Sequence, residues 1–313
     1  MTRIVFMGTP AFSVPILEAL VANQYQVIAV VTQPDRRVGR KKIIQAPPVK
    51  ASAVKLGIPI YQPEKIKDSR EMAEIIALKP DLIITAAFGQ FLPEALLQSA
   101  SLGAINVHAS LLPKYRGGAP VHYAIMNGDT KTGVTIIEMV KKMDAGTMWA
   151  QREIPIEMAD NVGTMFDKLS ILGKTLLLDT LPSYIAGTLK GEAQDESLVS
   201  ITPNITPEQE VIDWQKDAMT IYNQIRGLYP WPIAHTTWQN ERLKIQKAEV
   251  INEAVTALPG TIVKKGKKEL LVATNNGLIS IKELQPFGKA SMPITSFLNG
   301  LGQKLKVGDR FGE

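Results

Sequence analysis

The sequence predicts an α/β protein with a doubly wound, mostly parallel sheet, followed by a small all-β unit towards the C-terminus. In the first part, short apolar runs alternate with stretches of helical periodicity, as repeated β-α units do. In the last part, short β-like runs are separated by turn residues. The length of 313 residues allows two domains, and a hydrophobic content of 45% supports packed cores.

The apolar runs of the first part predict strands that are covered on both faces. Several of them are almost continuously apolar, which is typical of parallel strands between two layers of helices. We expect strands at residues 4–7, 27–31, 58–61, 82–86, 104–107 and 133–139. We expect helices at residues 14–22, 49–56, 70–78 and 94–98, and a long helix at 161–185.

A polar, proline-containing stretch separates the two parts. We therefore expect a first domain at residues 1–189, a linker at 190–207 with a short extended piece at 198–201, and a second domain at 208–313. A helix at 218–227 opens the second domain and is broken by Tyr229-Pro230-Trp231-Pro232. Strands are then expected at 234–238, 243–250, 260–263, 269–273 and 278–284.

Composition excludes several classes of function. The chain has no cysteine, so disulfides, cysteine nucleophiles and thiolate metal sites are ruled out. Histidine spacing of the zinc-site kind is also missing, and we expect no protein-bound metal. A β-like run follows the N-terminus directly, leaving no room for a signal peptide, and no apolar run is long enough for a membrane span. We expect a cytoplasmic protein that acts as a monomer without a membrane.

Positive charge is concentrated in two short segments. The formal net charge of +5 permits a polyanionic partner but does not require one. The loop at residues 33–48 is long for a strand-to-helix connection, which indicates a functional loop. Its basic residues are Arg36, Arg37, Arg40, Lys41 and Lys42, and a second group is Lys264, Lys265, Lys267 and Lys268. Solubility or binding of a nucleic-acid backbone would explain either group.

The segment Asn106-Val107-His108-Ala109-Ser110-Leu111-Leu112-Pro113 carries the strongest sign of chemistry. It places an amide and one of the chain's three histidines two residues apart, at the end of a predicted strand. An amide donor can stabilise an oxyanion and an imidazole can move a proton, while a carboxylate such as Asp144 can hold the imidazole. Such residues also cap strand ends without any catalytic role. The following loop, with prolines at both ends and two central glycines, favours function, namely acyl-type transfer without a covalent enzyme intermediate.

This region resembles the folate-dependent formyltransferases. The resemblance rests on the run NVHASLLPKYRGGAPVHYAIMNGDTKTGVTIIEM, which continues to the MDAGTM segment that contains Asp144. It extends to the opening RIVFMGTPAFSVPIL, to TQPDR, to AAFGQFLP, and to the later IDW and YPWP segments. It therefore covers nearly the whole chain.

The resemblance implies a set of site residues and a formyl donor. Asn106, His108 and Asp144 would be the catalytic trio, and 10-formyltetrahydrofolate would be the donor. The folate site would be lined by Phe88, Gly89, Gln90, Leu92, Ser110, Leu111, Leu112 and Pro113. The first domain would be a Rossmann-like formyltransferase domain, and the second an OB-like β-barrel.

The basic loop implies the branch of this family that formylates the amino group of methionyl initiator tRNA for translation initiation. In that branch the loop enters the acceptor stem, and Arg40 matches the arginine that reads the first base pair. This chain reads GRKK at residues 39–42, one glycine fewer after Arg40 than the GRGKK expected from that branch. All the basic residues named above would then bind tRNA. The alternative is a formyltransferase that acts on a sugar-nucleotide amine. A non-catalytic RNA-binding module would leave the trio unexplained.

Overall fold

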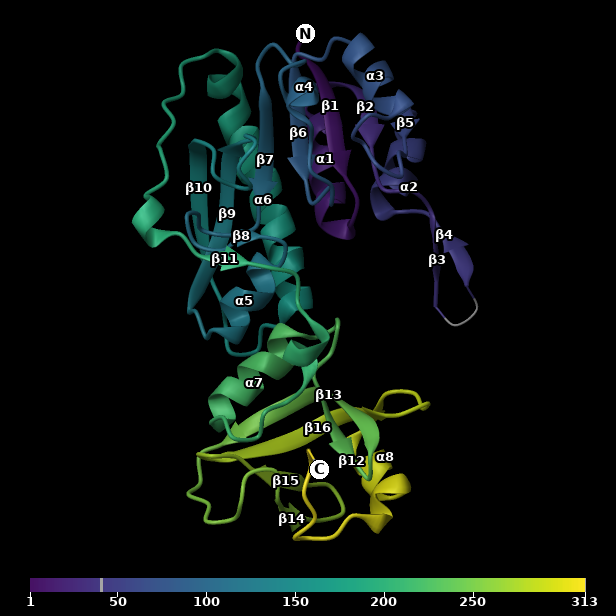
Figure 1. Cartoon of the computed structure of the whole chain (residues 1–313), viewed down its shortest axis with the longest axis vertical. Coiled ribbons are helices and arrows are strands. Elements are labelled where there is room, and N and C mark those ends of the chain that lie inside the picture. Colours follow the sequence, from purple (N-terminus) through teal and green to yellow (C-terminus); the bar gives the residue numbers. More distant parts are fainter. Residues whose placement is uncertain (40–41, 313) are drawn as a thin grey trace. The chain divides into compact units, whose positions relative to one another are not determined.

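The computed structural model describes residues 1–39 and 42–312, in which the chain forms two compact units (Figure 1). The first unit comprises Met1–Pro120, Thr132–Ile154 and Phe166–Thr202. The second comprises Val121–Lys131, Pro155–Met165 and Pro203–Glu313. The predicted fold class is confirmed, because the first unit is built on a mostly parallel sheet flanked by helices and the second on an antiparallel sheet.

The sheet of the first unit has seven strands in the order β10-β9-β7-β6-β1-β2-β5. The bounds are β1 Arg3–Gly8, β2 Gln26–Val31, β5 Ile60–Tyr61, β6 Leu82–Ala86, β7 Ala104–His108, β9 Lys131–Glu138 and β10 Met148–Pro155. The strands from β7 to β5 pair in parallel, and β9 pairs antiparallel with β7. The edge strand β10 was not predicted, because its sequence MWAQREIP is too polar to stand out.

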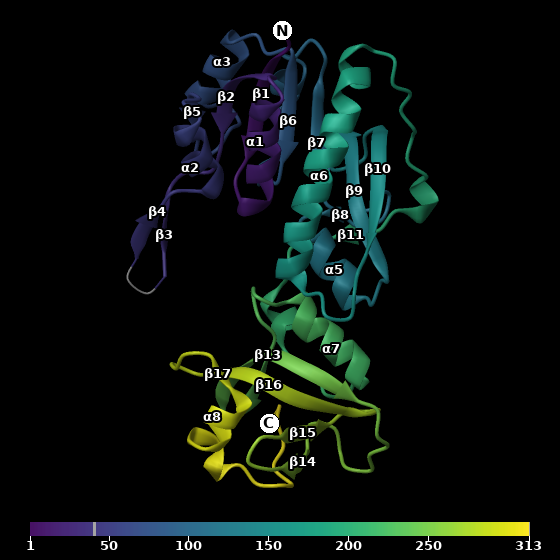
Figure 2. The same ribbon diagram turned by 180° about the vertical axis from the view of Figure 1, so that it is seen from behind.

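Helices cover both faces of this sheet, as the continuous apolar strands predicted. Val5 and Met7 of β1 share a buried cluster with Ile75 of α3 (Arg70–Ala77) and Leu96 of α4 (Glu94–Leu97). On the opposite face lie α1 (Val14–Ala22) and α6 (Val162–Ile185) (Figure 2). Gly173 of α6 lies against β7, β9 and α1 side chains. Each large apolar side chain buried in these layers contributes roughly 1.5–3 kcal/mol.

The strand order has a switch point between β1 and β6. The chain winds outwards from β1 through β2 to β5, by way of α1 and α2 (Pro48–Lys55), and then returns to β6 on the other side of β1. In open α/β sheets, ligands bind outside the carboxyl ends of the strands near such a point. The loops that follow β1, β6 and β7 meet at this edge.

Several short elements lie outside the predicted pattern. Arg36–Val38 (β3) and Ile43–Gln45 (β4) form a two-stranded hairpin. Arg116–Gly117 (β8) pairs in parallel with Ile201–Thr202 (β11). Residues 190–202, expected as part of a linker, lie within the first unit, and the 3-10 helix Glu196–Leu198 precedes β11. Two-residue strands and single turns have no periodicity from which to predict them.

The second unit contains a six-stranded antiparallel sheet that curls into a half-barrel. Its strands are β12 His235–Trp238, β13 Glu241–Ile251, β14 Ile262–Lys265, β15 Leu270–Ala273, β16 Leu278–Pro286 and β17 Met292–Pro293. The register of β13 against β16 shifts on both sides of Lys247, and bulges of this kind bend a strand and increase its twist. The main path of the sheet runs in the order β12-β13-β16-β15-β14.

Helices of the second unit pack on this sheet. Ala218–Gly227 (α7) begins at Asp217, whose carboxylate accepts a hydrogen bond from the backbone N–H of Thr220. Ile221 and Ile225 of α7 lie in the core with Trp214. Pro120–Met126 (α5) and Ile294–Leu298 (α8) are two further helices. Within residues 1–39 and 42–312, no helix combines the length and apolar character needed to cross a membrane.

Candidate active site

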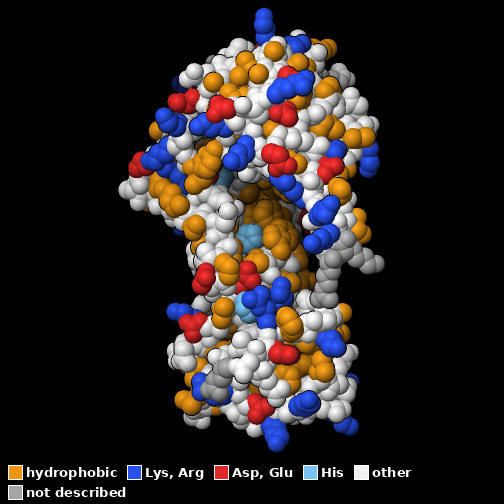
Figure 3. Space-filling view, turned by 45° about the vertical axis from the view of Figure 1, so that its right-hand side comes forward, with side chains coloured by type: hydrophobic (Ala, Val, Ile, Leu, Met, Phe, Trp, Pro, Cys, Tyr) orange, Lys and Arg blue, Asp and Glu red, His pale blue; other side chains and the backbone are white. Residues whose placement is uncertain are grey.

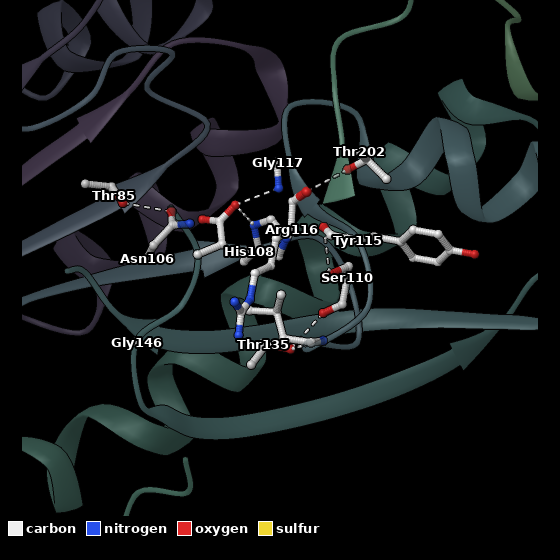
Figure 4. Close-up of polar contacts among 12 residues, drawn as sticks. Thr85, Asn106, His108, Ser110, Tyr115, Arg116, Gly117, Thr135, Gly146 and Thr202 are labelled. Carbon is white, nitrogen blue, oxygen red and sulfur yellow. Dashed lines mark hydrogen bonds and ion pairs between the residues drawn. The ribbon is translucent and has the colours of Figure 1, made fainter. Parts of the chain in front are cut away.

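His108 and Asp144 lie together at the carboxyl end of β7. The Nε2 atom of His108 is 3.0 Å from the carbonyl oxygen of Tyr115, and a carbonyl only accepts, so Nε2 carries the proton. In the neutral ring Nδ1 then has the lone pair, and it faces Oδ2 of Asp144 at 3.7 Å. Both side chains are mostly enclosed, with 6% and 16% of their surfaces exposed. Nδ1 can therefore accept a proton and form an imidazolium beside a carboxylate (Figure 4).

The backbone around Asp144 is shaped to present this carboxylate. Asp144 has a φ of 50°, in the left-handed region that short polar residues tolerate better than others. Its Oδ2 accepts a 2.8 Å hydrogen bond from the backbone N–H of Gly117. Gly117 has a φ of 122°, and a side chain there would collide with the carbonyl of Thr202. Glycine is thus required where the loop approaches Asp144.

Asn106 lies in the same strand as His108 and has a determined amide orientation. The hydroxyl of Thr85 in β6 donates a 2.7 Å hydrogen bond to Oδ1 of Asn106. The amide nitrogen, Nδ2, therefore points to the other side (Figure 4). Among the described residues, Nδ2 has no acceptor. It is left to donate to a ligand oxygen.

The Ser110–Pro113 loop is held mainly by its own hydrogen bonds. Ser110 is fully buried and donates to the carbonyl of Lys114 at 2.8 Å. Its carbonyl accepts from the hydroxyl of Thr135, which in turn accepts from the backbone N–H of Leu112. Leu112 is also buried, Leu111 is half-buried, and the Leu112–Pro113 peptide is cis. The loop thus presents a fixed backbone, and its serine side chain serves the loop itself.

The segment Phe88–Leu92, which follows β6, is held by hydrogen bonds to other segments of the first unit. The carbonyl of Phe88 accepts from the hydroxyl of Thr9 at 3.0 Å and from the amide of Gln33 at 3.2 Å. Gly89 has a φ of 87°. The amide oxygen of Gln90 accepts from the backbone N–H of Ile66, and Leu92 packs on the apolar cluster of that sheet face. Phe88 is buried, so the ring belongs to the core.

The basic loop residues differ in how they are engaged. Arg36 in β3 makes a two-nitrogen ion pair with Glu64, at 3.1 and 2.6 Å. Arg37 and Lys42 are exposed. Arg40 and Lys41, also predicted to bind tRNA, lie outside the described residues. Lys and Arg side chains are interspersed with Asp and Glu side chains over the face shown in Figure 3.

The second basic group surrounds the β14–β15 turn. Lys264 pairs with Glu269 at 2.7 Å. Lys265 donates to the backbone carbonyls of Gln303 and Leu305, which ties the C-terminal segment to β14. Lys267 and Lys268 are exposed. Lys265 therefore has a structural role in the second unit, and the two exposed lysines are better placed to meet phosphate.

The other histidines are buried in the second unit. His122 lies in α5 with its ring 6.2 Å from that of Trp231, and His235 lies in β12. Burial lowers the pKa of His122, and the backbone of Trp231 offsets part of this effect. Burial also lowers the pKa of His235. The fold thus favours the neutral form of both rings more than a free imidazole does.

The lowered pKa of His122 predicts a loss of stability in mild acid. The unfolded chain binds a proton near pH 6.5 more readily than the folded chain does, so this contribution is full above that pH and is lost as pH falls through the folded pKa. His122→Gln should reduce the drop in unfolding free energy between about pH 7.5 and pH 5, measured by urea denaturation. An undiminished drop in the variant would contradict the assignment.

Three residues that support the site were not singled out from the sequence. Thr85 orients Asn106, and a hydroxyl within the apolar strand LIITA was the available signal. Arg116 is buried in the loop after His108, and its Nε and Nη2 donate to the amide oxygen of Gln194 at 3.0 and 2.9 Å. No local pattern marks Gln194.

In the described part of the chain, no cluster of three or more His, Asp or Glu residues could hold a metal ion.

Comparisons with known proteins identify the family of the chain. The formyl transferase family pattern matches residues 2–181, and the pattern for the formyl transferase C-terminal domain matches residues 204–302. A methionyl-tRNA formyltransferase of Enterococcus faecalis is 59% identical over 311 residues, which cover 99% of each chain. One of Streptococcus suis is 56% identical over 314 residues, which cover both chains completely.

Solved structures support the fold. An N-formyltransferase of Helicobacter canadensis, in complex with folinic acid and dTDP-3-aminofucose, has a TM-score of 0.69 at 20% identity, and the match covers 92% of this chain and 100% of that one. HypX of Aquifex aeolicus, in complex with tetrahydrofolic acid, has a TM-score of 0.68 at 18% identity, with 98% of this chain and 48% of that one covered. Together with the two full-length relatives, these matches lead to one assignment. The chain belongs to the formyl transferase family, among its methionyl-tRNA formyltransferases.

Proposed function

We infer that this protein transfers the formyl group of 10-formyltetrahydrofolate to the amino group of methionyl initiator tRNA, giving N-formylmethionyl-tRNA for translation initiation. Relatives that bear this activity in their names match the chain over its full length. The observation that carries the chemistry is the grouping of Asn106, His108 and Asp144 at the carboxyl end of β7. It combines an oriented amide donor with an imidazole–carboxylate pair.

Asn106 supplies the oxyanion contact in the proposed mechanism. Attack of the methionyl amine on the formyl carbon forms a C–N bond and moves negative charge onto the formyl oxygen. Because Thr85 holds Oδ1 of Asn106, Nδ2 stays available to donate to that oxygen. A donor that needs no reorganisation stabilises the transition state more than the ground state.

His108 and Asp144 move the proton. Nδ1 of His108 accepts the proton that the attacking nitrogen loses, and Asp144 stabilises the resulting imidazolium. The same proton then reaches the folate nitrogen as its bond to the formyl carbon breaks. The hydrogen bond from Nε2 to the Tyr115 carbonyl keeps the ring in place during both transfers. Electrons and protons balance with no other reactant.

The folate donor would be held at the edge of the sheet beside this trio. The segment Phe88–Leu92 follows β6 and the segment Ser110–Pro113 follows β7. Since β6 and β7 are neighbours in the sheet, the two segments leave it side by side, next to the switch point. Since Ser110 and Gln90 use their side chains internally, recognition by these two segments would be through backbone groups. Backbone donors and acceptors suit the amide-like edge of a pteridine ring.

We also propose that residues 1–189 form the catalytic domain and 208–313 the tRNA-binding domain, joined by 190–207, of which 190–202 lie in the first compact unit. The separate family matches at 2–181 and 204–302 support this division. We propose that the enzyme acts in the cytoplasm as a monomer and that it does not bind a membrane. A sedimentation measurement of the purified protein at working concentration tests the monomer, and a dimer mass would overturn it.

The basic residues of the two predicted segments are expected to contribute to tRNA affinity through phosphate contacts. We include Arg36, Arg37, Arg40, Lys41, Lys42, Lys264, Lys265, Lys267 and Lys268 in the proposed surface. Arg37→Ala and Lys42→Ala should each weaken tRNA binding and lower the slope of log affinity against log salt by about 1. Arg36→Ala should have a smaller effect, because Arg36 is already paired with Glu64. Lys55→Ala, an exposed lysine of α2, serves as the control. If all variants and the control had the same slope of log affinity against log salt, the proposed tRNA-binding surface would be wrong.

The function itself is tested by transfer of labelled formyl from 10-formyltetrahydrofolate to methionyl-tRNA, with initiator and elongator tRNA compared. Transfer to the initiator is the expected result. A sugar-nucleotide amine, the alternative acceptor, is not favoured, because the full-length relatives are named for the tRNA reaction. Tetrahydrofolate binding without transfer to either tRNA would overturn the proposed acceptor.

A further inference from the structure

Gln194 joins two loops that meet at Asp144. Its amide nitrogen donates to the backbone carbonyls of Asp144 and Gly146, both at 2.8 Å. Its amide oxygen accepts from Nε and Nη2 of Arg116 at 3.0 and 2.9 Å. Two residues earlier, Glu192 pairs with Met148 at the start of β10, through two backbone hydrogen bonds of 2.8 Å. Gln194 is thus anchored next to the loop that it contacts.

The orientation of the Gln194 amide follows from its neighbours. An arginine side chain can only donate, so the amide oxygen must face Arg116. Backbone carbonyls only accept, so the nitrogen must face Asp144 and Gly146. Both amide hydrogens and the oxygen are therefore used. A side chain of another shape or donor pattern cannot satisfy both loops.

Arg116 is buried with most, but not all, of its donors paired. It is 1% exposed, and its Nη2 also pairs with Glu196 at 2.8 Å. Within the residues that the structure describes, its Nη1 is buried without a hydrogen-bond partner. Unsatisfied buried donors are rare because each costs stability. The contacts that Arg116 makes thus hold neighbouring loops while one of its own donors stays unpaired.

Arg116 is connected both to the carboxylate of Asp144 and to its main chain. The residue after Arg116 is Gly117, whose N–H holds the Asp144 carboxylate. Through Gln194, the Arg116 side chain holds the Asp144 main chain. Glu196 extends the contact to Lys142, at 2.7 Å. Asp144 has a left-handed backbone, a conformation that persists when surrounding contacts determine it.

We propose that Gln194 and Arg116 are positioning residues for formyl transfer, which hold the Asp144 loop so that its carboxylate faces Nδ1 of His108. This inference rests on the proposed function, in which Asp144 stabilises the His108 imidazolium. Neither residue needs to touch substrate. Their effect should therefore appear in kcat and depend on the presence of Asp144.

The test uses Gln194→Met in the full-length enzyme. Methionine has a similar length but donates no hydrogen bond, so the Asp144 and Gly146 carbonyls are released. We expect kcat to fall at least tenfold, with KM for initiator methionyl-tRNA changed less than twofold. Gln194→Glu is a second variant, which keeps an acceptor for Arg116 and replaces the two donors by a carboxylate. It should lose activity to a similar extent, and it remains informative if the methionine variant folds poorly.

Gln224→Met is the matched control. The Gln224 amide, in α7 of the second unit, also donates to two backbone carbonyls, those of Gln209 and Val211, each at 2.9 Å. The control therefore removes two amide-to-carbonyl hydrogen bonds of the same kind, away from Asp144. The two hydrogen bonds that Gln194 accepts from Arg116 have no counterpart in it. We expect it to keep wild-type kcat.

A double-mutant cycle with Asp144→Asn separates positioning from general loss of structure. If Gln194 acts through Asp144, Gln194→Met should lower kcat less than twofold further in the Asp144→Asn enzyme. A full tenfold loss in that background, or wild-type kcat in Gln194→Met, would overturn the proposal. A wild-type enzyme that transfers no formyl group would instead overturn the proposed function, so the two failures are distinguishable.

Discussion

His108→Ala is expected to lower kcat for formyl transfer by about 10²–10⁴-fold, the usual range for removal of a general acid–base group. The variant removes Nδ1, which faces Asp144 at 3.7 Å, and leaves the carboxylate without the partner that it stabilises. Attack by the amine would then depend on water to take its proton. Initial rates at saturating 10-formyltetrahydrofolate and methionyl-tRNA measure the effect.

The affinity for tRNA should change little in the same variant, because His108 is 6% exposed and lies in the interior of the first unit. Asp144→Ala should likewise lower kcat much more than tRNA affinity. His122→Gln provides the control, since it replaces a buried histidine of the second unit. Normal turnover by either the His108 or the Asp144 variant would refute the assigned proton path.

Asn106→Ala is expected to lower kcat by about 10²–10³-fold, as the loss of one oxyanion donor does in other acyl-transfer sites. The hydrogen bond from Thr85 orients the amide before substrate arrives, so the wild-type enzyme pays no reorganisation cost in the transition state. The alanine variant loses this donor while the His108–Asp144 pair is retained. Single-turnover rates with bound substrates isolate this chemical step.

Thr85→Val tests whether the orientation of Asn106 contributes. Valine keeps the shape of threonine but removes the hydroxyl that donates to Oδ1 at 2.7 Å. We expect a loss of kcat smaller than that of Asn106→Ala, because the amide remains and only its orientation is released. If Asn106→Ala were as active as wild type, the oxyanion would have to be bound by other groups and the mechanism would be wrong at this step.

Local patterns in the sequence were sufficient to predict the parallel sheet of the first unit. They also pointed to Asn106 and His108, two residues of the proposed trio. The strands at β1, β2, β6 and β7 were predictable because parallel strands buried on both faces are continuously apolar. Asn106 and His108 are two residues apart in one strand, so both side chains point to the same face. Their proximity therefore follows from the period of a β-strand.

The rest of the site depends on contacts between residues that are distant in the chain. Asp144 meets His108 only because β9 pairs antiparallel with β7 and the following loop turns back over the strand end. Gln194 reaches Asp144 across 50 residues and Arg116 across 78. The sequence offered Asp144 only as one candidate carboxylate, the resemblance to known formyltransferases placed it in the trio, and no feature of the sequence singled out Gln194.

The sheet was predictable and the polar contacts of the site were not, because the two kinds of signal act over different ranges along the chain. Hydrophobic periodicity and turn chemistry operate over a few residues, so they can be read along the chain. The donor and acceptor groups of Gln194, Arg116 and Thr85 are ordinary until their partners are known, because a polar side chain gains its role from the group it faces. Folding brought those partners together, and the tertiary structure alone decided how the carboxylate and the amide of the proposed catalytic site are held.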